Sequence, residues 1–255
     1  MKIIPLIAIL ITVSLFLNKE CLAGSGFTKT QKMMHESRVP EPSTLVLFGS
    51  GILSMVISFV RRTYRATKRS MDILGSMAAV IVLSPVCILT ALLIKLTSKG
   101  QVIFRQTRLG LNGQTFEIYK FRTMRADAEK HTGPVWAVKN DNRLIPGGSF
   151  LRKTHIDEIP QFINVLKGEM SIIGPRPERP FFVDKFKNQI TGYEKRLLVK
   201  PGITGLAQVW HRYDETIKDV KIKVKYDLLY IKKMCLLTDL QILYQTIRVV
   251  LTCPY

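Results

Sequence analysis

Residues 71–94 read MDILGSMAAVIVLSPVCILTALLI, an apolar stretch with a Ser84-Pro85 pair near its middle. Because a proline inside a helix removes one backbone hydrogen bond and collides with the preceding turn, we expect the helix to kink or break at this pair. Bases flank the stretch, Lys68 before it and Lys95 after it, and the positive-inside bias favours cytoplasmic positions for both. A helix that dips into the membrane, breaks at Ser84-Pro85 and returns meets this requirement. A kinked ordinary span is the alternative.

Two further apolar segments precede this one. Residues 1–23 contain an apolar run shorter than a full span and end in a small-residue site, so they are either a cleaved signal peptide or a retained first membrane helix. Residues 43–60 carry no charge and lead into a pair of arginines that begins at Arg61. The basic flank places Arg61 on the cytoplasmic side. We therefore expect residues 24–62 to form a short exported loop followed by a transmembrane segment.

The chain is strongly basic. It carries 38 lysines and arginines against 19 acidic residues, a formal net charge of +19, and most of the bases follow residue 60. Such a field suits nucleic acid, anionic lipid headgroups or a phosphate-rich substrate. Mean hydropathy is nevertheless +0.14, so apolar and basic residues occupy separate segments, as in a protein at a membrane surface. Trp136 and Trp210 form no aromatic and basic patch, so we expect no nucleic-acid partner.

After residue 99 no long apolar run remains, so residues 100–255 are expected to form a cytoplasmic domain on the re-entrant membrane helix of residues 63–99. Alternating stretches at 101–104 and 116–119 predict short strands joined through the turn-forming residues 110–113. The expected helices cover three stretches: 123–130, 156–167 and 219–252. The fold class is α+β, mostly helical, with small β elements and amphipathic C-terminal helices.

The last of these stretches, residues 219–252, mixes lysines with apolar residues. Basic amphipathic helices of this kind lie in the membrane interface against anionic lipid. Packing against the preceding domain explains the same pattern, and the sequence leaves both interpretations open.

An adjacent pair of carboxylates, Asp157-Glu158, follows Arg152 closely in the sequence. A lone acidic pair is commonly a helix N-terminus, where acids interact favourably with the helix dipole, and Thr154 followed by Asp157 has the spacing of a capping box. His155, beside the pair, is interpreted as a positioning or surface residue. The pair gains its interest from the bases around it.

Basic residues stand on both sides of the pair. Lys120 and Arg122 end a predicted strand, and Arg176 lies in a proline-punctuated loop. Transferring a phosphosugar from a diphosphate needs a nucleophile at phosphorus, a divalent cation and arginines for the non-bridging oxygens. Arginine suits the last task because its fork binds phosphate oxygens in a bidentate way. Residues 120–179 supply one such set.

Residues 61–255 resemble the bacterial sugar transferase family, the monotopic polyprenyl-phosphate hexose-1-phosphate transferases. The matching stretches are VIFRQ (102–106), RLG (108–110), KFRTM (120–124), LRKT (151–154), DEIPQ (157–161), NVLKG (164–168), GPRPE (174–178), PGITG (201–205) and YDLLY (226–230). A second resemblance lies upstream: VPEPSTL at 39–45, followed by one helix and an arginine pair, is similar to the PEP-CTERM sorting segment of exosortase substrates.

The family resemblance implies roles for the site residues. Asp157 would attack the phosphate attached to the sugar and form a phosphosugar-aspartyl intermediate. Glu158, with Asp157, would hold Mg²⁺, or Glu158 would help to deprotonate the acceptor. The implied phosphate-binding cations are Arg152, Arg176, Lys120 and Arg122. Asp227 and His155 are candidates for supporting groups behind the pair, and Ser84-Pro85 matches the break in the family's re-entrant helix. His155 stands where the family more often has serine.

The resemblance also implies the partners. The donor would be a nucleotide sugar, with UDP as its nucleotide, and the acceptor polyprenyl (undecaprenyl) phosphate in the lipid bilayer. The reaction would begin exopolysaccharide or O-antigen-type glycan assembly at the cytoplasmic face of the bacterial inner membrane. The sorting segment implies exosortase as a further partner. The alternative function is an exosortase-sorted membrane protein whose enzyme-like domain is a non-catalytic scaffold.

Overall fold

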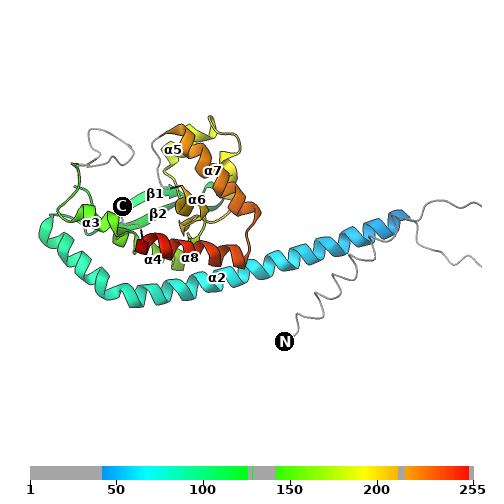
Figure 1. Cartoon of the computed structure of the whole chain (residues 1–255), viewed down its shortest axis with the longest axis horizontal. Coiled ribbons are helices and arrows are strands. Elements are labelled where there is room, and N and C mark those ends of the chain that lie inside the picture. Colours follow the sequence, from blue (N-terminus) through cyan, green and yellow to red (C-terminus); the bar gives the residue numbers. More distant parts are fainter. Residues whose placement is uncertain (1–41, 126–127, 129–141, 212–215, 253–255) are drawn as a thin grey trace, which may run out of the picture. The chain divides into compact units, whose positions relative to one another are not determined.

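The computed structural model describes residues 42–125, 128, 142–211 and 216–252 (Figure 1). The chain divides into two compact units, Met1–Ile52 and Leu53–Tyr255. In the first unit only residues 42–52 are described, and they are helical. The expectations for the signal segment and the exported loop therefore lie outside the described residues. In the second unit, helices surround two small sheets, which confirms the α+β, mostly helical fold class.

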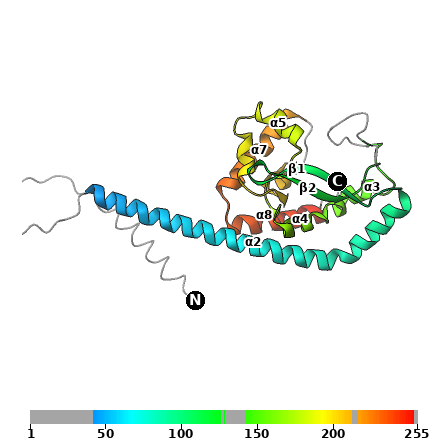
Figure 2. The same ribbon diagram turned by 180° about the vertical axis from the view of Figure 1, so that it is seen from behind.

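Helix α2 covers Pro42–Thr97 and passes through Pro85 without interruption. The chain therefore does not break at Ser84-Pro85. Proline cannot donate a hydrogen bond to the carbonyl of Ile81, four residues earlier, and the Ser84 hydroxyl donates to that carbonyl instead, at 2.8 Å. Because the freed carbonyl regains a donor, the helix bends rather than ends. Figures 1 and 2 both show this part of α2 curved, with its concave side toward the sheets and shorter helices.

The second half of α2 exposes a long row of apolar side chains. Among the described residues, the Ser50–Thr97 part of this helix is the one long and apolar enough to cross a membrane. Soluble proteins rarely expose contiguous apolar patches of this extent. The exposed apolar residues between 74 and 96 include Leu74, Met77, Ile81, Val82, Ile88, Leu89, Leu92 and Leu96. A membrane surface is the environment that this face of the helix suits.

Two small sheets follow the helix. Strands β1 (Ile103–Leu109) and β2 (Thr115–Phe121) form an antiparallel hairpin, with Arg105 opposite Tyr119. The 3-10 turn η2 (Leu111–Gly113) joins them, and Asn112 adopts a positive φ of 53° there. Strands β3 (Ser171–Ile173) and β4 (Gly202–Thr204) pair in parallel. The predicted hairpin and its turn are confirmed, although β1 begins two residues later than expected.

The remaining helices are short until the C-terminal pair. They are α3 (Gly148–Lys153), η3 (Ile156–Glu158), α4 (Gln161–Lys167), α5 (Pro180–Lys187), η4 (Tyr193–Leu198), α6 (Leu206–Trp210), α7 (Ile217–Lys232) and α8 (Leu236–Thr252). The expected helix at 156–167 is thus two elements, because Pro160 begins α4 afresh after the 3-10 turn. The expected helix at 123–130 is wrong in its described part, where Met124 instead makes a β-bridge with Leu144.

The core attaches this domain to both ends of the curved part of α2. At the C-terminal end, Ile94 is fully buried against Phe121 and Leu151. At the other end, the Tyr64 hydroxyl donates to Asp239 of α8 at 2.8 Å, and the Lys68 ammonium bonds the same carboxylate at 3.0 Å. One compact domain therefore contacts the helix at points that lie some thirty residues apart in the sequence.

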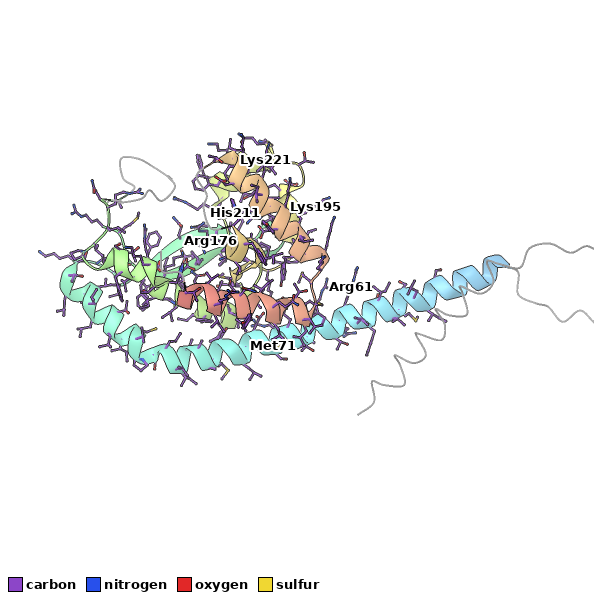
Figure 3. All side chains as sticks on the ribbon, in the orientation of Figure 1. Arg61, Met71, Arg176, Lys195, His211 and Lys221 are labelled. Atoms are coloured by element: carbon purple, nitrogen blue, oxygen red, sulfur yellow. The ribbon has the colours of Figure 1, made fainter. Side chains whose placement is uncertain are left out.

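The two C-terminal helices differ in their surroundings. Helix α8 buries Asp239 and Ile242 while it exposes a stripe of apolar residues at helical spacing, Leu237, Leu240, Tyr244 and Ile247. One face of α8 therefore packs on the domain, and the other suits a membrane interface. All the lysines of these two helices lie in α7, and Figure 3 shows Lys221 at the end of α7 remote from α2.

Candidate active site

The carboxylate pair lies in η3, a single 3-10 turn between α3 and α4. His155 precedes it with a positive φ of 55°, so the chain turns sharply into the pair. The capping box expected from Thr154 and Asp157 is absent: the Thr154 hydroxyl donates back to the carbonyl of Phe150 at 2.8 Å, and η3 has no side-chain cap. A structural cap therefore does not account for the pair.

Glu158 is held by two cations from two other elements. The Lys120 ammonium, on β2, donates to Oε1 of Glu158 at 2.6 Å. The Arg176 guanidinium, from the loop after β3, donates to the same oxygen at 2.8 Å and approaches Oε2 at 3.4 Å. Burial opposes ionisation of this carboxyl, but the charges of Arg176 and Lys120 outweigh it and hold the pKa of Glu158 well below its usual range.

Asp157 is in the opposite situation. Its side chain is 8% exposed, and burial together with the negative charge of Glu158 raises the pKa of Asp157 to about 6, against the lowering effect of Lys120, Arg152 and Arg176. Two neighbouring carboxyls therefore differ in how readily they ionise. Sites that give two acids different tasks separate their pKa values in this way.

Three of the four predicted phosphate-binding cations gather around the pair, and the fourth does not. Arg152 acts electrostatically on Asp157 and donates through Nε to the Thr123 hydroxyl at 3.1 Å. Arg122 is only 6% exposed and donates to the carbonyls of Lys99 and Ser98, both at 2.9 Å. It holds the chain that leaves α2. Strand β2 ends at Phe121, and the guanidinium of Arg122 is directed to these backbone carbonyls and not to the pair. The predicted role of Arg122 in phosphate binding is therefore not supported.

Asp227 is linked to the pair through Arg196 and the Arg176 loop. Its carboxylate accepts a hydrogen bond from Arg196 Nε at 2.7 Å, and both side chains are buried. The same guanidinium donates to the backbone carbonyl of Arg176 at 3.1 Å. Removing one member of a buried ion pair typically costs about 3–5 kcal/mol of stability. Asp227 and Arg196 together therefore fix the loop that carries Arg176.

Figure 3 shows Arg176 within the body of the second unit, above the stretch of α2 that carries Met71. The site thus consists of two carboxyls with different pKa values, Asp157 and Glu158, with Lys120, Arg152 and Arg176 beside them. The domain that carries them packs on the long, largely apolar helix α2. The family model for bacterial sugar transferases matches residues 63–253. The chain belongs to the bacterial sugar transferase family. A second family model, the PEP-CTERM protein-sorting motif, matches residues 38–62, so both resemblances noted in the sequence are confirmed.

Two relatives of this bacterial sugar transferase are named as transferases that use undecaprenyl phosphate. A UDP-N-acetylgalactosamine-undecaprenyl-phosphate N-acetylgalactosaminephosphotransferase of Aeromonas hydrophila is 48% identical over 189 residues, which cover 74% of this chain and 44% of the relative. A UDP-glucose:undecaprenyl-phosphate glucose-1-phosphate transferase of Klebsiella pneumoniae is 43% identical over 182 residues, or 71% of this chain and 39% of the relative. The chain thus spans less than half the length of these two relatives.

A shorter relative is covered almost in full. The exopolysaccharide production protein PSS of Rhizobium leguminosarum is 38% identical over 185 residues, which make up 71% of this chain and 92% of that protein. Each of the three relatives thus matches between 71% and 74% of the present chain.

Two further residues of this sugar transferase support the site and were not singled out by sequence reasoning. Arg108 donates to the backbone carbonyl of Pro177 at 3.1 Å and lies 3.6 Å from Glu178. Burial lowers the pKa of Arg108 to about 10, although the charge of Glu178 opposes this. Arg196 is the second missed residue. Arg108 lies in one of the stretches that resemble the family, but no role was assigned to it. Arg196 lies in none of them, and no local spacing marks it among the many arginines of this basic chain.

The pair also has to be tested as a metal site. Among the described residues, no cluster of three or more His, Cys, Asp or Glu side chains could hold a metal ion. Mg²⁺, however, usually takes only one or two carboxylates and fills its other positions with water and substrate phosphate oxygens. Asp157 and Glu158 offer such carboxylates side by side. The donor set therefore fits Mg²⁺ in the presence of a diphosphate substrate.

Proposed function

We propose that this protein transfers a sugar-1-phosphate from a UDP-sugar to undecaprenyl phosphate, the first step of exopolysaccharide or O-antigen-type glycan assembly. The observation that carries the proposal is the difference between the two carboxyls of the Asp157-Glu158 pair. Lys120 and Arg176 form ion pairs with Glu158, whereas the pKa of Asp157 is raised to about 6. The relatives from Aeromonas and Klebsiella act, by their names, on undecaprenyl phosphate.

Asp157 is the nucleophile in this scheme. Its carboxylate oxygen attacks the phosphorus that bears the sugar, the bond to the bridging oxygen of the diphosphate breaks, and the nucleoside monophosphate leaves with that electron pair. The product is an acyl phosphate between Asp157 and the sugar phosphate. An oxygen of the lipid phosphate then attacks the same phosphorus, which restores the Asp157 carboxylate and forms a diphosphate between lipid and sugar.

The cations supply most of the electrostatic stabilisation. Arg176 and Lys120 bind Glu158 in the absence of substrate, and a diphosphate offers them stronger partners. Arg152, which already acts on Asp157, binds phosphate oxygens beside them. When Arg176 turns to the substrate, Glu158 becomes available to Mg²⁺ or to the acceptor. Bound Mg²⁺ would be held by Glu158 and Asp157 and would neutralise charge on the diphosphate.

The site faces the cytoplasm in this proposal, on a helix that enters and leaves the membrane on one side. From Lys68 to Ile94 the helix measures about 39 Å at 1.5 Å per residue, more than the roughly 30 Å of a bilayer's apolar core. Both residues contact the same domain. An ordinary span between them would draw that domain into the lipid, whereas a bent helix lying in one leaflet would not.

The PEP-CTERM match at residues 38–62 supports exosortase as a partner. It also supports the alternative candidate function, an exosortase-sorted membrane protein whose domain is a non-catalytic scaffold. That alternative predicts normal product formation in cells after loss of Asp157. The segment ends at residue 62, within α2, and the sugar transferase match begins at residue 63. Because the two matches do not overlap, sorting and transfer are compatible in one chain.

The test is a release assay with the full chain in detergent, Mg²⁺, undecaprenyl phosphate and a panel of UDP-sugars. We expect release of UMP, not UDP, for at least one sugar, and a labelled phosphosugar bound covalently to the protein when the acceptor is omitted. Asp157→Asn should abolish both signals because an amide does not attack phosphorus. Full activity of Asp157→Asn would contradict the mechanism, and release of UDP would indicate transfer of the sugar without its phosphate.

A further inference from the structure

Helix α2 carries a single acidic residue, Asp72, and the side chain is only 5% exposed. Three residues earlier lies Arg69, half-buried on the same side of the helix. Ionisable side chains on an otherwise apolar membrane helix are costly and tend to be retained for function. Neither residue lies in the active site, so their partners decide what they do.

Arg69 binds the end of the helix that follows the carboxylate pair. Its guanidinium donates to the carbonyl of Val165 at 2.6 Å and to that of Leu166 at 2.9 Å. These carbonyls belong to the last turn of α4, where N–H donors become scarce and a cation is favourable. The N–H of Gly168 also donates to the carbonyl of Val165, at 3.0 Å. Helix α4 begins at Gln161, three residues after Glu158. Arg69 therefore fixes helix α4, which directly follows η3, the turn that carries the pair.

Asp72 binds the strand that leads to Arg176. Its Oδ1 accepts a hydrogen bond from the Ser171 hydroxyl at 3.1 Å and another from the backbone N–H of Ile172 at 2.9 Å. Strand β3 ends at Ile173, and the Arg176 loop follows at once. The contact is close: a Cβ added at Gly75 would lie 2.9 Å from the side chain of Ile172.

We propose that Arg69 and Asp72 are positioning residues, which set the Arg176 loop against the Asp157-Glu158 pair from one turn of the membrane helix. The inference rests on the proposed function. Two segments that meet at the 2.8 Å contact between Arg176 and Glu158 are each tied to α2, at positions three residues apart. A shift of either tie moves one side of that contact relative to the other, and reactive geometry tolerates little displacement.

The experiment measures the first turnover of the full chain in lipid nanodiscs, with the active UDP-sugar and no acceptor. The amplitude of UMP release counts competent enzyme, and its rate constant reports geometry. We expect Asp72→Ala to lower the rate constant by about tenfold or more, with an amplitude close to that of the wild type. Asp72→Asn should restore the rate, because both hydrogen bonds end on one oxygen, which asparagine retains.

Arg69→Met should slow release in the same way, and Arg69→Lys should recover part of the loss, because an ammonium replaces one of the two donors. Arg65→Met is the matched control: it removes the same charge one turn earlier on the same helix, where the side chain is exposed, and should leave the rate unchanged. A lower amplitude at an unchanged rate constant would mean that Asp72 and Arg69 serve folding alone, and would overturn the inference.

Two further outcomes would also overturn it: Asp72→Ala as fast as the wild type, or Asp72→Asn as slow as Asp72→Ala. A wild-type chain that releases no UMP from any UDP-sugar would overturn the proposed function and this inference with it. An active wild type with an equally active Asp72→Ala would overturn the inference alone.

Discussion

Adjacent carboxyls are rarely equivalent when they are buried together, because two negative charges a few ångströms apart repel each other strongly outside water. Here the asymmetry has a visible cause. Lys120 and Arg176 both donate to Oε1 of Glu158, so Glu158 is the first of the two carboxyls to ionise as the pH rises. Asp157 ionises against the resulting negative charge, with help from Lys120, Arg152 and Arg176. Glu158 thereby helps to raise the pKa of Asp157, the proposed nucleophile.

This arrangement predicts how the first turnover depends on pH. Burial and the charge of Glu158 raise the pKa of Asp157 to about 6, and only the ionised carboxylate can attack phosphorus. The rate constant of UMP release should therefore be level above that pH and fall about tenfold per pH unit well below it. Rapid-quench measurement of UMP over this range checks the prediction. A rate that stays level far below pH 6 would contradict it, and Asp157→Asn provides the background.

The sequence could predict which residue types the site contains, but not all their directions. Lys120 and Arg122 looked equivalent because both end a strand near an acidic motif. The strand places Lys120 against Glu158, whereas Arg122 turns back to carbonyls at the end of α2. That difference depends on the position of the residues that follow α2, which lie 23 and 24 residues before Arg122 in the sequence. No local pattern encodes it, and the same holds for the bond from Arg196 to the Arg176 loop.

At the level of elements, local signals were reliable where one short motif determines the outcome. The hairpin follows from alternation and a turn at Asn112-Gly113, both of which have positive φ. The helix expected at 123–130 failed because Met124 pairs with a segment about twenty residues away. The break expected at Ser84-Pro85 became a bend, because a side-chain donor replaced the missing N–H. Proline alone predicts that a bond is lost, and its neighbour decides whether the helix survives.

The bend itself makes a prediction for Pro85→Ala. Alanine restores the N–H that can donate to Ile81 and has a far higher helix propensity, so an isolated helix would gain about 3 kcal/mol. In this protein a straighter α2 would draw Ile94 away from Phe121 and Leu151. We therefore expect Pro85→Ala to lower the thermal unfolding temperature and the activity. Leu93→Ala, an exposed change in the same half of the helix, is the control. A higher unfolding temperature with full activity would contradict this account.

On the scale of the whole second unit, the domain does not simply sit at the end of a membrane anchor. It contacts α2 through a polar cluster around Asp239 at one end and through an apolar cluster around Ile94 at the other. The apolar row from Leu74 to Leu96 lies between and beyond these contacts. This division of the helix into a face for protein and a face for lipid suits the proposed transfer from a water-soluble donor to a membrane-bound acceptor.

That arrangement predicts that both ends of the bent segment face the same compartment. In a chain whose native cysteines are replaced by serine, Ser70→Cys and Gln101→Cys place single exposed thiols before and after it. A membrane-impermeant maleimide should label both in inverted inner-membrane vesicles and neither in intact spheroplasts, because one cytoplasmic domain contacts both ends. Ser37→Cys, in the sequence expected to be exported, should show the reverse and so verify the orientation of each preparation. Labelling of either thiol in spheroplasts would mean that α2 crosses the membrane between them, and the domain could not then keep both of its contacts with the helix.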